Sequence, residues 1–244
     1  MSEQKNYTRE ECIFLAKLYE KAEKFPEMVK FINKFAQLDP KLSKDERNIL
    51  ESGFKNLVSD KRASWRFLNN MEKREEKKNS PQIVYIREVK ENIEKELNQI
   101  YDEIHKTIDK YLMPNASDSE NKAFYLRLKG DYYRYKCEFA NGKDFDEVCA
   151  KAEKVYKEAY ELSNICLSIS NSIRLGCALN YSVFNYEIKK SKEEAIDIAK
   201  KAFDEFMAVL DDLEISKAID TLPSIQLLKE NLISWCTELN EEEN

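Results

Sequence analysis

The segment KAFYLRLKGDYYRY, residues 122–135, combines a helical pattern with three charged side chains on one stripe. Arg127 and Arg134 are seven residues apart, and Asp131 lies between them at helical spacing, so that a helix would bring all three to one face. Aromatic and aliphatic residues on the other sides would anchor this helix in a core. The pattern predicts a long helix that presents two guanidinium groups and a carboxylate together.

A second cationic row is predicted earlier in the chain. Lys55, Arg62 and Arg66 follow one another at spacings of seven and four, which again places them on one face of a helix. A charged stripe on a single helix is most often only a solvated surface. Two such rows in one chain favour a local site for an anion.

The composition predicts an all-α protein. A chain of 244 residues can bury a full core, and with 42% hydrophobic residues, four glycines and five prolines it favours a few long helices. The net charge of -6 argues against a general nucleic-acid binder, which needs a surplus of cations. The polar N-terminus and the absence of a long apolar run predict a cytoplasmic protein without a signal peptide or membrane span.

The cysteine and histidine content argues against metal sites and common catalytic groups. Six cysteines show no Cys-x-x-Cys spacing and fall in helical patterns, which predicts buried free thiols. His105 is the only histidine, so histidine-based metal clusters and most catalytic triads are excluded. We therefore expect no metal, no cofactor and no enzymatic activity.

Nine antiparallel helices joined by short polar loops are expected. Three capping boxes, at 43–46, 117–120 and 191–194, mark helix starts, and Ser80-Pro81 is interpreted as a cap and first helical residue. Pro223 is interpreted as the first residue of the last helix. The expected helices cover about 9–23, 26–38, 43–74, 80–112, 117–141, 144–166, 172–189, a segment from 191, and 223–239.

Several stretches of this chain resemble the signature stretches of the 14-3-3 family in order and spacing. They are residues 47–50, 54–58, 62–66, 114–117, 124–135 and 173–184, within a similarity from about residue 10 to about residue 237. The resemblance implies one domain, 1–244, forming an L-shaped subunit with a concave amphipathic groove. Residues 9–112 would supply the dimer floor and first groove wall, 117–239 the second wall, and 240–244 a short acidic tail.

The resemblance also implies where a phosphorylated ligand would bind. The phosphate would be held by Lys55, Arg62, Arg134 and Tyr135, because guanidinium and ammonium donors match its charge and acceptor oxygens. Asn180 and Asn231 would bond the backbone of an extended peptide, since an amide on an apolar helix needs a partner. The remaining groove residues implied are Arg66, Arg127, Asp131, Leu179, Val183, Glu187, Leu227 and Trp235.

Four residues depart from the family pattern in this groove. Ser52, Ser224 and Ser234 stand where the family usually has aliphatic residues, and Pro223 would unwind the first turn of the last helix. Each lost aliphatic contact would cost roughly 1 to 3 kcal/mol if fully buried in a complex. The departures predict retained phosphate selectivity with an altered flank preference and reduced affinity.

The resemblance further implies a homodimer, or a heterodimer with another isoform. Lys24 would pair with the partner's Glu96, whereas Asn92 replaces a second bridging residue and Val89 replaces an aromatic one, which predicts a dimer that is weaker or differently arranged than is usual in the family. Ser64 is interpreted either as a phosphorylation site that splits the dimer or as a buried helix serine. The interface residues implied are Leu18, Ala22, Lys24, Ser64, Val89 and Glu96.

Three functions remain open at this point. The first is an adaptor that binds phosphorylated client proteins, with neither nucleic acid nor membrane as a partner. The second is a phosphate-independent helical scaffold of tetratricopeptide type. The third, a phosphohydrolase, is disfavoured because the basic residues lack a nearby nucleophile-base pair, a metal ligand set or a histidine.

Overall fold

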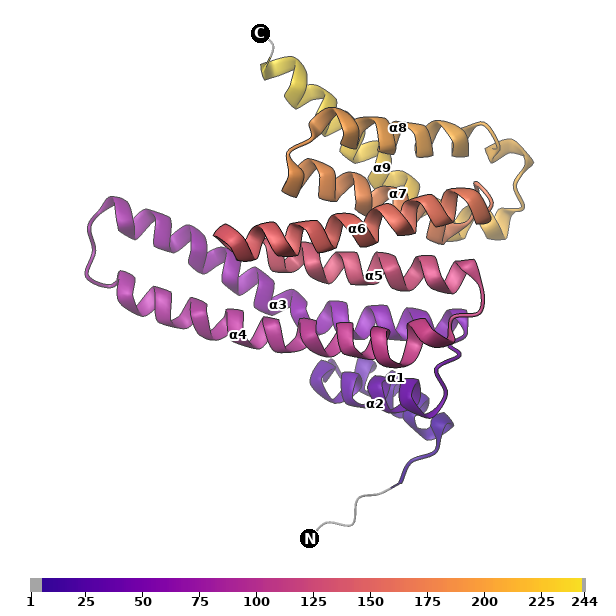
Figure 1. Ribbon diagram of the computed structural model, residues 1–244, viewed down its shortest axis with the longest axis horizontal. Helices are drawn as coiled ribbons and strands as arrows, with labels where there is room; N and C mark the ends of the chain where they lie inside the picture. The colour runs from indigo at the N-terminus through magenta and orange to yellow at the C-terminus, as the bar shows by residue number, and fades with distance from the viewer. Residues whose placement is uncertain (1–5, 243–244) are drawn as a thin grey trace. The chain divides into compact units, whose positions relative to one another are not determined.

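The computed structural model describes residues 6–242, with the side chains of all of these except 215–218 and 242. In this part of the chain there are nine α-helices and no strand, which confirms the predicted all-α fold (Figure 1). The helices form two compact units, and the boundary between them lies between Asn115 and Ala116. None of the described helices is long and apolar enough to cross a membrane.

The first unit contains two antiparallel helix pairs. A capping box at Thr8 and Glu11 begins α1, and the predicted box at Ser43 and Glu46 begins α3. The long helices α3 and α4 run antiparallel to each other in Figure 1, and α2 packs on α1 and α3. The elements are α1 (Arg9–Lys21), α2 (Phe25–Leu38), α3 (Lys44–Lys77), α4 (Ile83–Thr107) and a π-helical continuation (Ile108–Leu112).

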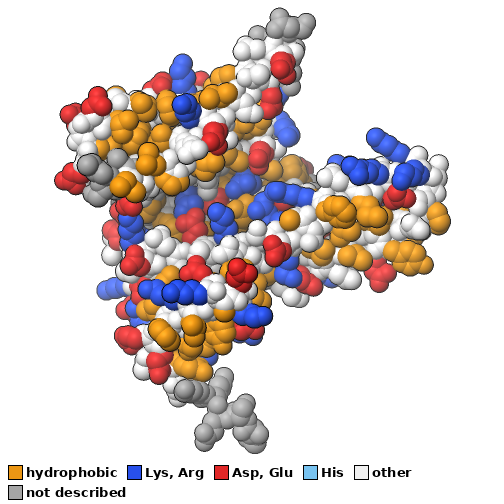
Figure 2. All heavy atoms as spheres, turned by 180° about the vertical axis from the view of Figure 1, so that it is seen from behind, with side chains coloured by type: hydrophobic (Ala, Val, Ile, Leu, Met, Phe, Trp, Pro, Cys, Tyr) orange, Lys and Arg blue, Asp and Glu red, His pale blue; other side chains and the backbone are white. Residues whose placement is uncertain are grey.

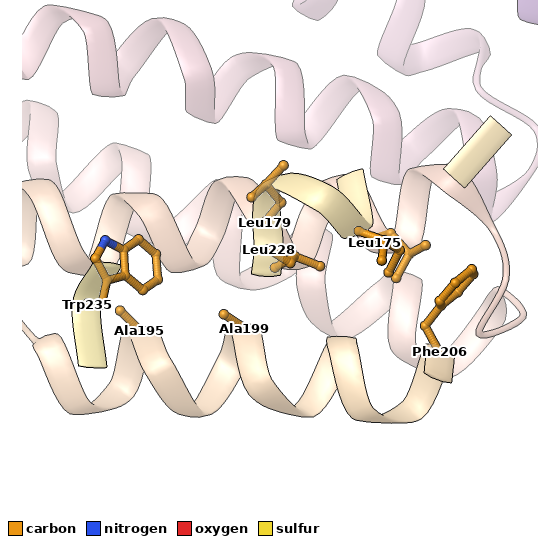
Figure 3. Packing of buried hydrophobic residues seen from close by; sticks show 8 residues of the cluster. Leu175, Leu179, Ala195, Ala199, Phe206, Leu228 and Trp235 are labelled. Carbon is orange, nitrogen blue, oxygen red and sulfur yellow. The ribbon is translucent and has the colours of Figure 1, made fainter. Parts of the chain in front are cut away.

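The second unit is built around α7, which contacts α5, α6, α8 and α9. Its core gathers apolar side chains of α7, α8 and α9, including Leu179, Phe206, Leu228 and Trp235 (Figure 3). The elements are α5 (Ser119–Cys137), α6 (Gly142–Cys166), α7 (Ser172–Phe184), a π-helix (Asn185–Lys189), α8 (Lys192–Met207) and α9 (Ile215–Glu242).

Two of the predicted helix starts are shifted by better caps or turns. Asp118, rather than Ser117, caps α5, and its carboxylate accepts the Asn121 backbone N–H at 2.7 Å. A carboxylate at this position also interacts favourably with the positive end of the helix dipole. Ser80 accepts the Gln82 N–H in a turn, so that α4 begins only after Ser80-Pro81.

The third predicted capping box, at 191–194, is also wrong. Ser191 stands at the N-cap of α8, but its side chain makes no capping hydrogen bond. Lys190, which follows the π-helix, is in a left-handed conformation, and the Ser191 N–H donates back to the carbonyl of Asn185. The end of the π-helix therefore determines the backbone conformation at Ser191, where a capping serine was predicted.

The last helix does not begin at Pro223, as predicted, but runs through it from Ile215 to Glu242. A proline inside a helix removes one backbone hydrogen bond and crowds the preceding turn. Thr221, Ile225 and Leu228 are buried on both sides of the exposed proline and hold the helix together across it. Of the predicted acidic tail, 240–242 belong to this helix, and 243–244 lie outside the described residues.

The prediction of buried cysteines is correct for only part of the set. The six cysteines, all within the described residues, are free thiols. Cys12, Cys137 and Cys177 are buried, and Cys149 is half-buried, whereas Cys166 and Cys236 are exposed. Cys166 is the last residue of α6, and Cys236 follows the buried Trp235 on α9.

Candidate functional site

Arg127, Asp131 and Arg134 come together on α5, as their spacing predicts. Asp131 Oδ2 lies 3.5 Å from Arg127 Nη1, and Asp131 Oδ1 lies 3.4 Å from Arg134 Nη2. The three side chains are only 10%, 6% and 12% exposed, respectively. Of the four residues expected to hold a phosphate, Arg134 was expected to stay solvated in the absence of that ligand, and it does not, because the buried Asp131 carboxylate pairs with it.

Asp131 accepts hydrogen bonds from two further side chains that come from other helices. The Tyr156 hydroxyl of α6 donates to Oδ1 at 2.6 Å, and the Asn180 amide of α7 donates to both oxygens at 2.8 and 3.0 Å. Tyr156 also accepts from Arg134 Nε at 3.1 Å. The sequence analysis missed Tyr156, since a tyrosine on an amphipathic helix carries no signal that separates it from an ordinary core aromatic.

The charge state of this network follows from burial and from its neighbours. Burial raises the pKa of Tyr156 well above its ordinary value, so the hydroxyl keeps its proton at neutral pH. Burial alone would lower the pKa of Arg134, but Tyr156, Tyr135 and Asp131 outweigh it and hold that pKa well above its ordinary value. Arg134 therefore stays a cation inside the protein.

Asn180 was expected to need a bound peptide as the partner of its amide, and the protein itself supplies one. The side-chain nitrogen donates to the Asp131 carboxylate, which can only accept. This contact fixes the orientation of the amide group. The Oδ1 atom of Asn180 is then the part of the side chain that can accept a hydrogen bond from a backbone N–H of another molecule.

The other predicted groove residues on α5 and in the π-helix surround Arg134. Its guanidinium carbon lies 4.8 Å from the ring centroid of Tyr135, within the range of a cation–π contact. Its Nη1 atom lies 3.7 Å from Glu187 Oε2, and that glutamate side chain is 57% exposed. Arg134 is thus in contact with an aromatic ring, one buried carboxylate and one exposed carboxylate.

The apolar residues predicted for the groove differ in what they touch. Leu179 is buried in the core of the second unit, and Val183 packs against that core. Leu227 is 47% exposed on α9. Trp235 is buried and stacks on Tyr186 with ring centroids 4.4 Å apart, so its ring holds α9 against the π-helix. Asn231 is half-buried on the same helix.

The cationic row of the first unit lies on α3, as predicted. Lys55 and Arg66 are exposed, and Arg62 is half-buried. Trp65, which lies between Arg62 and Arg66 in the sequence, is buried. Its indole N–H donates to Glu94 of α4 at 2.7 Å. This bond fixes the rotation of α3 and thereby the direction of its cationic face.

Two of the three serines that depart from the family pattern are engaged by carboxylates of their own unit. Ser52 donates to Glu20 Oε1 at 2.6 Å, which joins α3 to α1. Ser234 donates to Glu238 Oε1 at 3.2 Å within α9. Ser224 is half-buried one residue after Pro223. Ser52 and Ser234 therefore make polar interactions at positions where the family usually has aliphatic groove residues.

The residues predicted for a dimer interface lie on the surface of the first unit. Leu18 and Val89 are 50% and 49% exposed and belong to a larger set of exposed apolar side chains on this unit. Ala22, Lys24 and Ser64 are exposed too, which rules out the interpretation of Ser64 as a buried helix serine. Glu96 forms an ion pair with Lys61 of the same chain.

Hydrophobic side chains are exposed at several places on the first unit. Figure 2 shows them along the arm formed by α3 and α4 and again over α1 and α2. The large exposed apolar residues of this unit are Phe14, Leu18, Leu38, Phe67, Met71, Val84, Tyr85 and Val89. Large exposed apolar patches are more typical of surfaces that bind another protein than of surfaces that contact only water.

Metal ligands do not gather anywhere in residues 6–242: no group of three or more histidine, cysteine, aspartate or glutamate side chains could hold an ion. The described chain instead carries cations on helix faces, namely a row on α3 and a buried arginine pair on α5. These features define a class of all-helical proteins with rows of cationic side chains on long antiparallel helices.

The chain belongs to the 14-3-3 family. The family model described as "14-3-3 protein" matches residues 15–236. The chain is 42% identical to 14-3-3 protein 3 of Entamoeba histolytica over 97% of this chain and 99% of that protein. It is 40% identical to 14-3-3-like protein D of Nicotiana tabacum, over 99% of this chain and 98% of that protein.

Similarity extends to green algae as well. A 14-3-3-like protein of Chlamydomonas reinhardtii is 42% identical over 96% of this chain and 91% of its own length. Members of the family are adaptors rather than enzymes, and membership supports a phosphopeptide-binding adaptor role in general.

Proposed function

We propose that the protein is a phosphoserine/phosphothreonine-dependent adaptor that binds phosphorylated client proteins in an amphipathic groove and so regulates their activity, location or assembly. The observation that carries the proposal is the arrangement of Arg127 and Arg134 around the single carboxylate of Asp131. The two guanidinium groups share one buried carboxylate on a rigid helix, and the second carboxylate beside Arg134, that of Glu187, is exposed and only weakly engaged at 3.7 Å. A phosphate dianion is the ligand group that suits such guanidinium groups best.

Four residues are assigned to the phosphate on the basis of the family pattern. They are Lys55 and Arg62 of α3, and Arg134 and Tyr135 of α5. Hydrogen bonds between ionised partners contribute on the order of 1.5 to 3 kcal/mol each, so several of them make binding conditional on the phosphate. Arg66 and Arg127 would add to the positive potential without being the principal contacts.

The peptide on either side of the phosphate is assigned to α7 and α9. An extended peptide cannot satisfy its own amides, and Asn180 offers an acceptor because its nitrogen is already bound to Asp131. Asn231 would bond the backbone further along. The apolar wall would be formed by Leu179, Val183 and Leu227, and the exposed Glu187 would face basic residues of the ligand.

The serine departures are proposed to change which flanking residues this protein prefers. Ser52 and Ser234 each hold a carboxylate nearby, Glu20 and Glu238, respectively. Such a serine–carboxylate pair would interact less favourably with aliphatic residues that flank the phosphate in a peptide, and more favourably with basic or hydrogen-bonding ones. Affinity for ligands with apolar flanks would be reduced accordingly.

Self-association through the first unit is part of the proposal. The exposed apolar side chains of Leu18 and Val89 support it, because their burial against a partner would remove them from water. The partner would be a second copy or another isoform, and Lys24 would pair with its Glu96. Two linked sites would give high effective concentrations on doubly phosphorylated clients in the cytoplasm.

The proposed interface has its own test in Ser64, which is exposed on α3. Ser64→Glu places a negative charge where the partner chain would approach, and Ser64→Ala serves as the neutral control. Sedimentation velocity should show a lower dimer fraction for the glutamate variant alone. An unchanged sedimentation profile would remove Ser64 from the interface.

The main test is a fluorescence-polarisation titration of an arginine-rich serine peptide in phosphorylated and unphosphorylated forms. The proteins compared are the wild type, Arg62→Ala/Arg134→Ala, and Lys157→Ala, which removes an exposed charge elsewhere on the second unit. We expect the wild type and Lys157→Ala to bind the phosphorylated peptide alone, and the double variant to lose it. Equal binding of both peptide forms by the wild type would instead favour a phosphate-independent, tetratricopeptide-like scaffold.

A further inference from the structure

We propose that Tyr156 is a positioning residue whose hydroxyl fixes the orientations of Arg134 and Asn180 together. This inference rests on the proposed function, because it concerns one side chain assigned to the phosphate and one assigned to the ligand backbone. Tyr156 itself reaches neither ligand group in this assignment. It acts through hydrogen bonds, one direct and one through Asp131.

The hydrogen bonds of this network can run in only one direction. The Arg134 guanidinium can only donate, and the ionised Asp131 carboxylate can only accept. The single hydroxyl proton of Tyr156 must therefore go to Asp131 Oδ1 (2.6 Å), which leaves its oxygen to accept from Arg134 Nε (3.1 Å). Asn180 is bound to the same carboxylate and must turn its nitrogen toward it. The hydroxyl thus contacts Arg134 directly and is linked to Asn180 through the carboxylate that both bind.

The ring that carries this hydroxyl is itself held in place. Tyr156 is fully buried, and its ring centroid lies 5.3 Å from that of Phe184 and 6.3 Å from that of Tyr181. On the opposite helix, a Cβ atom at Gly130 would come within 2.6 to 2.8 Å of three ring carbons. The absence of a side chain at Gly130 is what lets the ring approach α5 closely enough for its hydroxyl to reach Asp131 and Arg134.

The consequence for Arg134 is that its guanidinium plane is held at two points, which leaves a third edge for a ligand. Nε is bound to Tyr156, and Nη2 lies 3.4 Å from Asp131. The Nη1 edge is left against the exposed Glu187, at 3.7 Å. A phosphate that displaces this weak contact meets a guanidinium edge that is already oriented. Without the Tyr156 hydroxyl, Arg134 keeps its charge but loses the bond that sets its rotation.

The test is Tyr156→Phe, which removes the hydroxyl and keeps the buried ring. Tyr160→Phe is the matched control, since it makes the same chemical change one helical turn along α6, where the ring packs on Tyr181. We expect Tyr156→Phe to raise the Kd for the phosphorylated serine peptide by about fivefold to tenfold, the effect of one lost hydrogen bond. The weak binding of the unphosphorylated peptide and all values for Tyr160→Phe should change less than about twofold.

A second readout needs no ligand. In a proton–nitrogen NMR spectrum of side-chain Nε–H groups, the Arg134 signal, assigned with Arg134→Lys, should shift in Tyr156→Phe and stay in place in Tyr160→Phe. A merely structural role for the tyrosine would lower stability without moving this signal selectively. An unmoved Arg134 signal overturns the inference.

The outcomes separate the inference from the function beneath it. If the wild type fails to prefer the phosphorylated peptide, the proposed function fails, and the NMR signal still decides whether Tyr156 positions Arg134. If the wild type prefers the phosphorylated peptide and Tyr156→Phe keeps this preference in full, the inference about Tyr156 is wrong and the proposed function stands. Should Tyr156→Phe not fold by circular dichroism, Asp131→Asn tests the same network, and its unchanged phosphate preference would equally overturn the inference.

Discussion

Gly130 and Gly176 lie inside helices of the second unit, and the same substitution should have opposite effects at the two positions. A Cβ added at Gly176 would have its nearest neighbour, Arg127 Cδ, at 3.6 Å, an ordinary contact distance. A helical glycine loses more backbone entropy on folding than an alanine does, and replacing it by alanine stabilises the folded state by about 1 kcal/mol. Gly176→Ala should therefore raise the free energy of unfolding by about 1 kcal/mol.

At Gly130 the same gain is outweighed by a clash. The new Cβ would lie 2.6 to 2.8 Å from ring carbons of Tyr156, and that ring is enclosed by Phe184 and Tyr181. Overpacking of a buried site costs about 1 to 3 kcal/mol, and a rigid, enclosed ring places this case near the upper end. Subtracting the helical gain of about 1 kcal/mol leaves a net destabilisation of about 2 kcal/mol.

The assay is chemical denaturation followed by circular dichroism, with Gly130→Ala, Gly176→Ala and the wild type measured side by side. The two variants should differ by about 3 kcal/mol in the free energy of unfolding, with the wild type between them. Gly130→Ala should also weaken phosphopeptide binding, because the displaced ring takes its hydroxyl away from Arg134. A Gly130→Ala protein as stable as the wild type would refute the packing argument for Tyr156.

Three further predictions concern other parts of the molecule. Burial raises the pKa of Glu46, but hydrogen bonds, chiefly from Arg9, lower it below its ordinary 4.5 overall. This pair should therefore stabilise the wild type over Glu46→Gln by about 2 kcal/mol at pH 7, an advantage lost as the pH falls below 4.5. Pro223→Ala should raise the thermal midpoint, because it restores a helical N–H inside α9. In the folded protein, Cys166 and Cys236 should react with a thiol reagent well before the buried cysteines.

Each of these has a contrary result. A constant difference between wild type and Glu46→Gln in denaturation curves from pH 7 to pH 3 would contradict the lowered pKa. An unchanged or lower midpoint for Pro223→Ala in a thermal melt would mean that the proline costs the helix nothing. Uniform labelling rates by mass spectrometry would contradict the burial of Cys137, whose pKa burial raises to about 12.

The predictions from the sequence that were confirmed concern contacts within one helix and the fold class. The contacts of Asp131 with Arg127 and Arg134 span four and three residues, so helical spacing alone predicts them. The capping box at Ser43 and Glu46 is equally local, and it is present. The all-α fold follows from composition and periodicity in the same way.

The rest could not be predicted, because it depends on how one helix packs on another. The contact of Tyr156 with Asp131 joins residues 25 apart, and that of Asn180 with Asp131 joins residues 49 apart. The first depends on the close approach of α5 and α6 at Gly130, and the second depends on the packing of α7 against α5. The prediction that α9 begins at Pro223 was wrong for a related reason. Local propensity places a proline at the start of a helix, but buried residues on both sides of Pro223 keep α9 continuous through it.

The internal carboxylate at Asp131 has a consequence for the speed of recognition. Arg134 and Asn180 are ordered by the protein itself, so the entropy of ordering them belongs to folding and is no longer lost when a ligand arrives. If phosphorylated ligands bind at these two side chains as proposed, association would then depend mainly on diffusion and charge, because Arg134 and Asn180 are already oriented. Phosphorylated ligands of different flanking sequence would accordingly differ in residence time far more than in the rate at which they are captured.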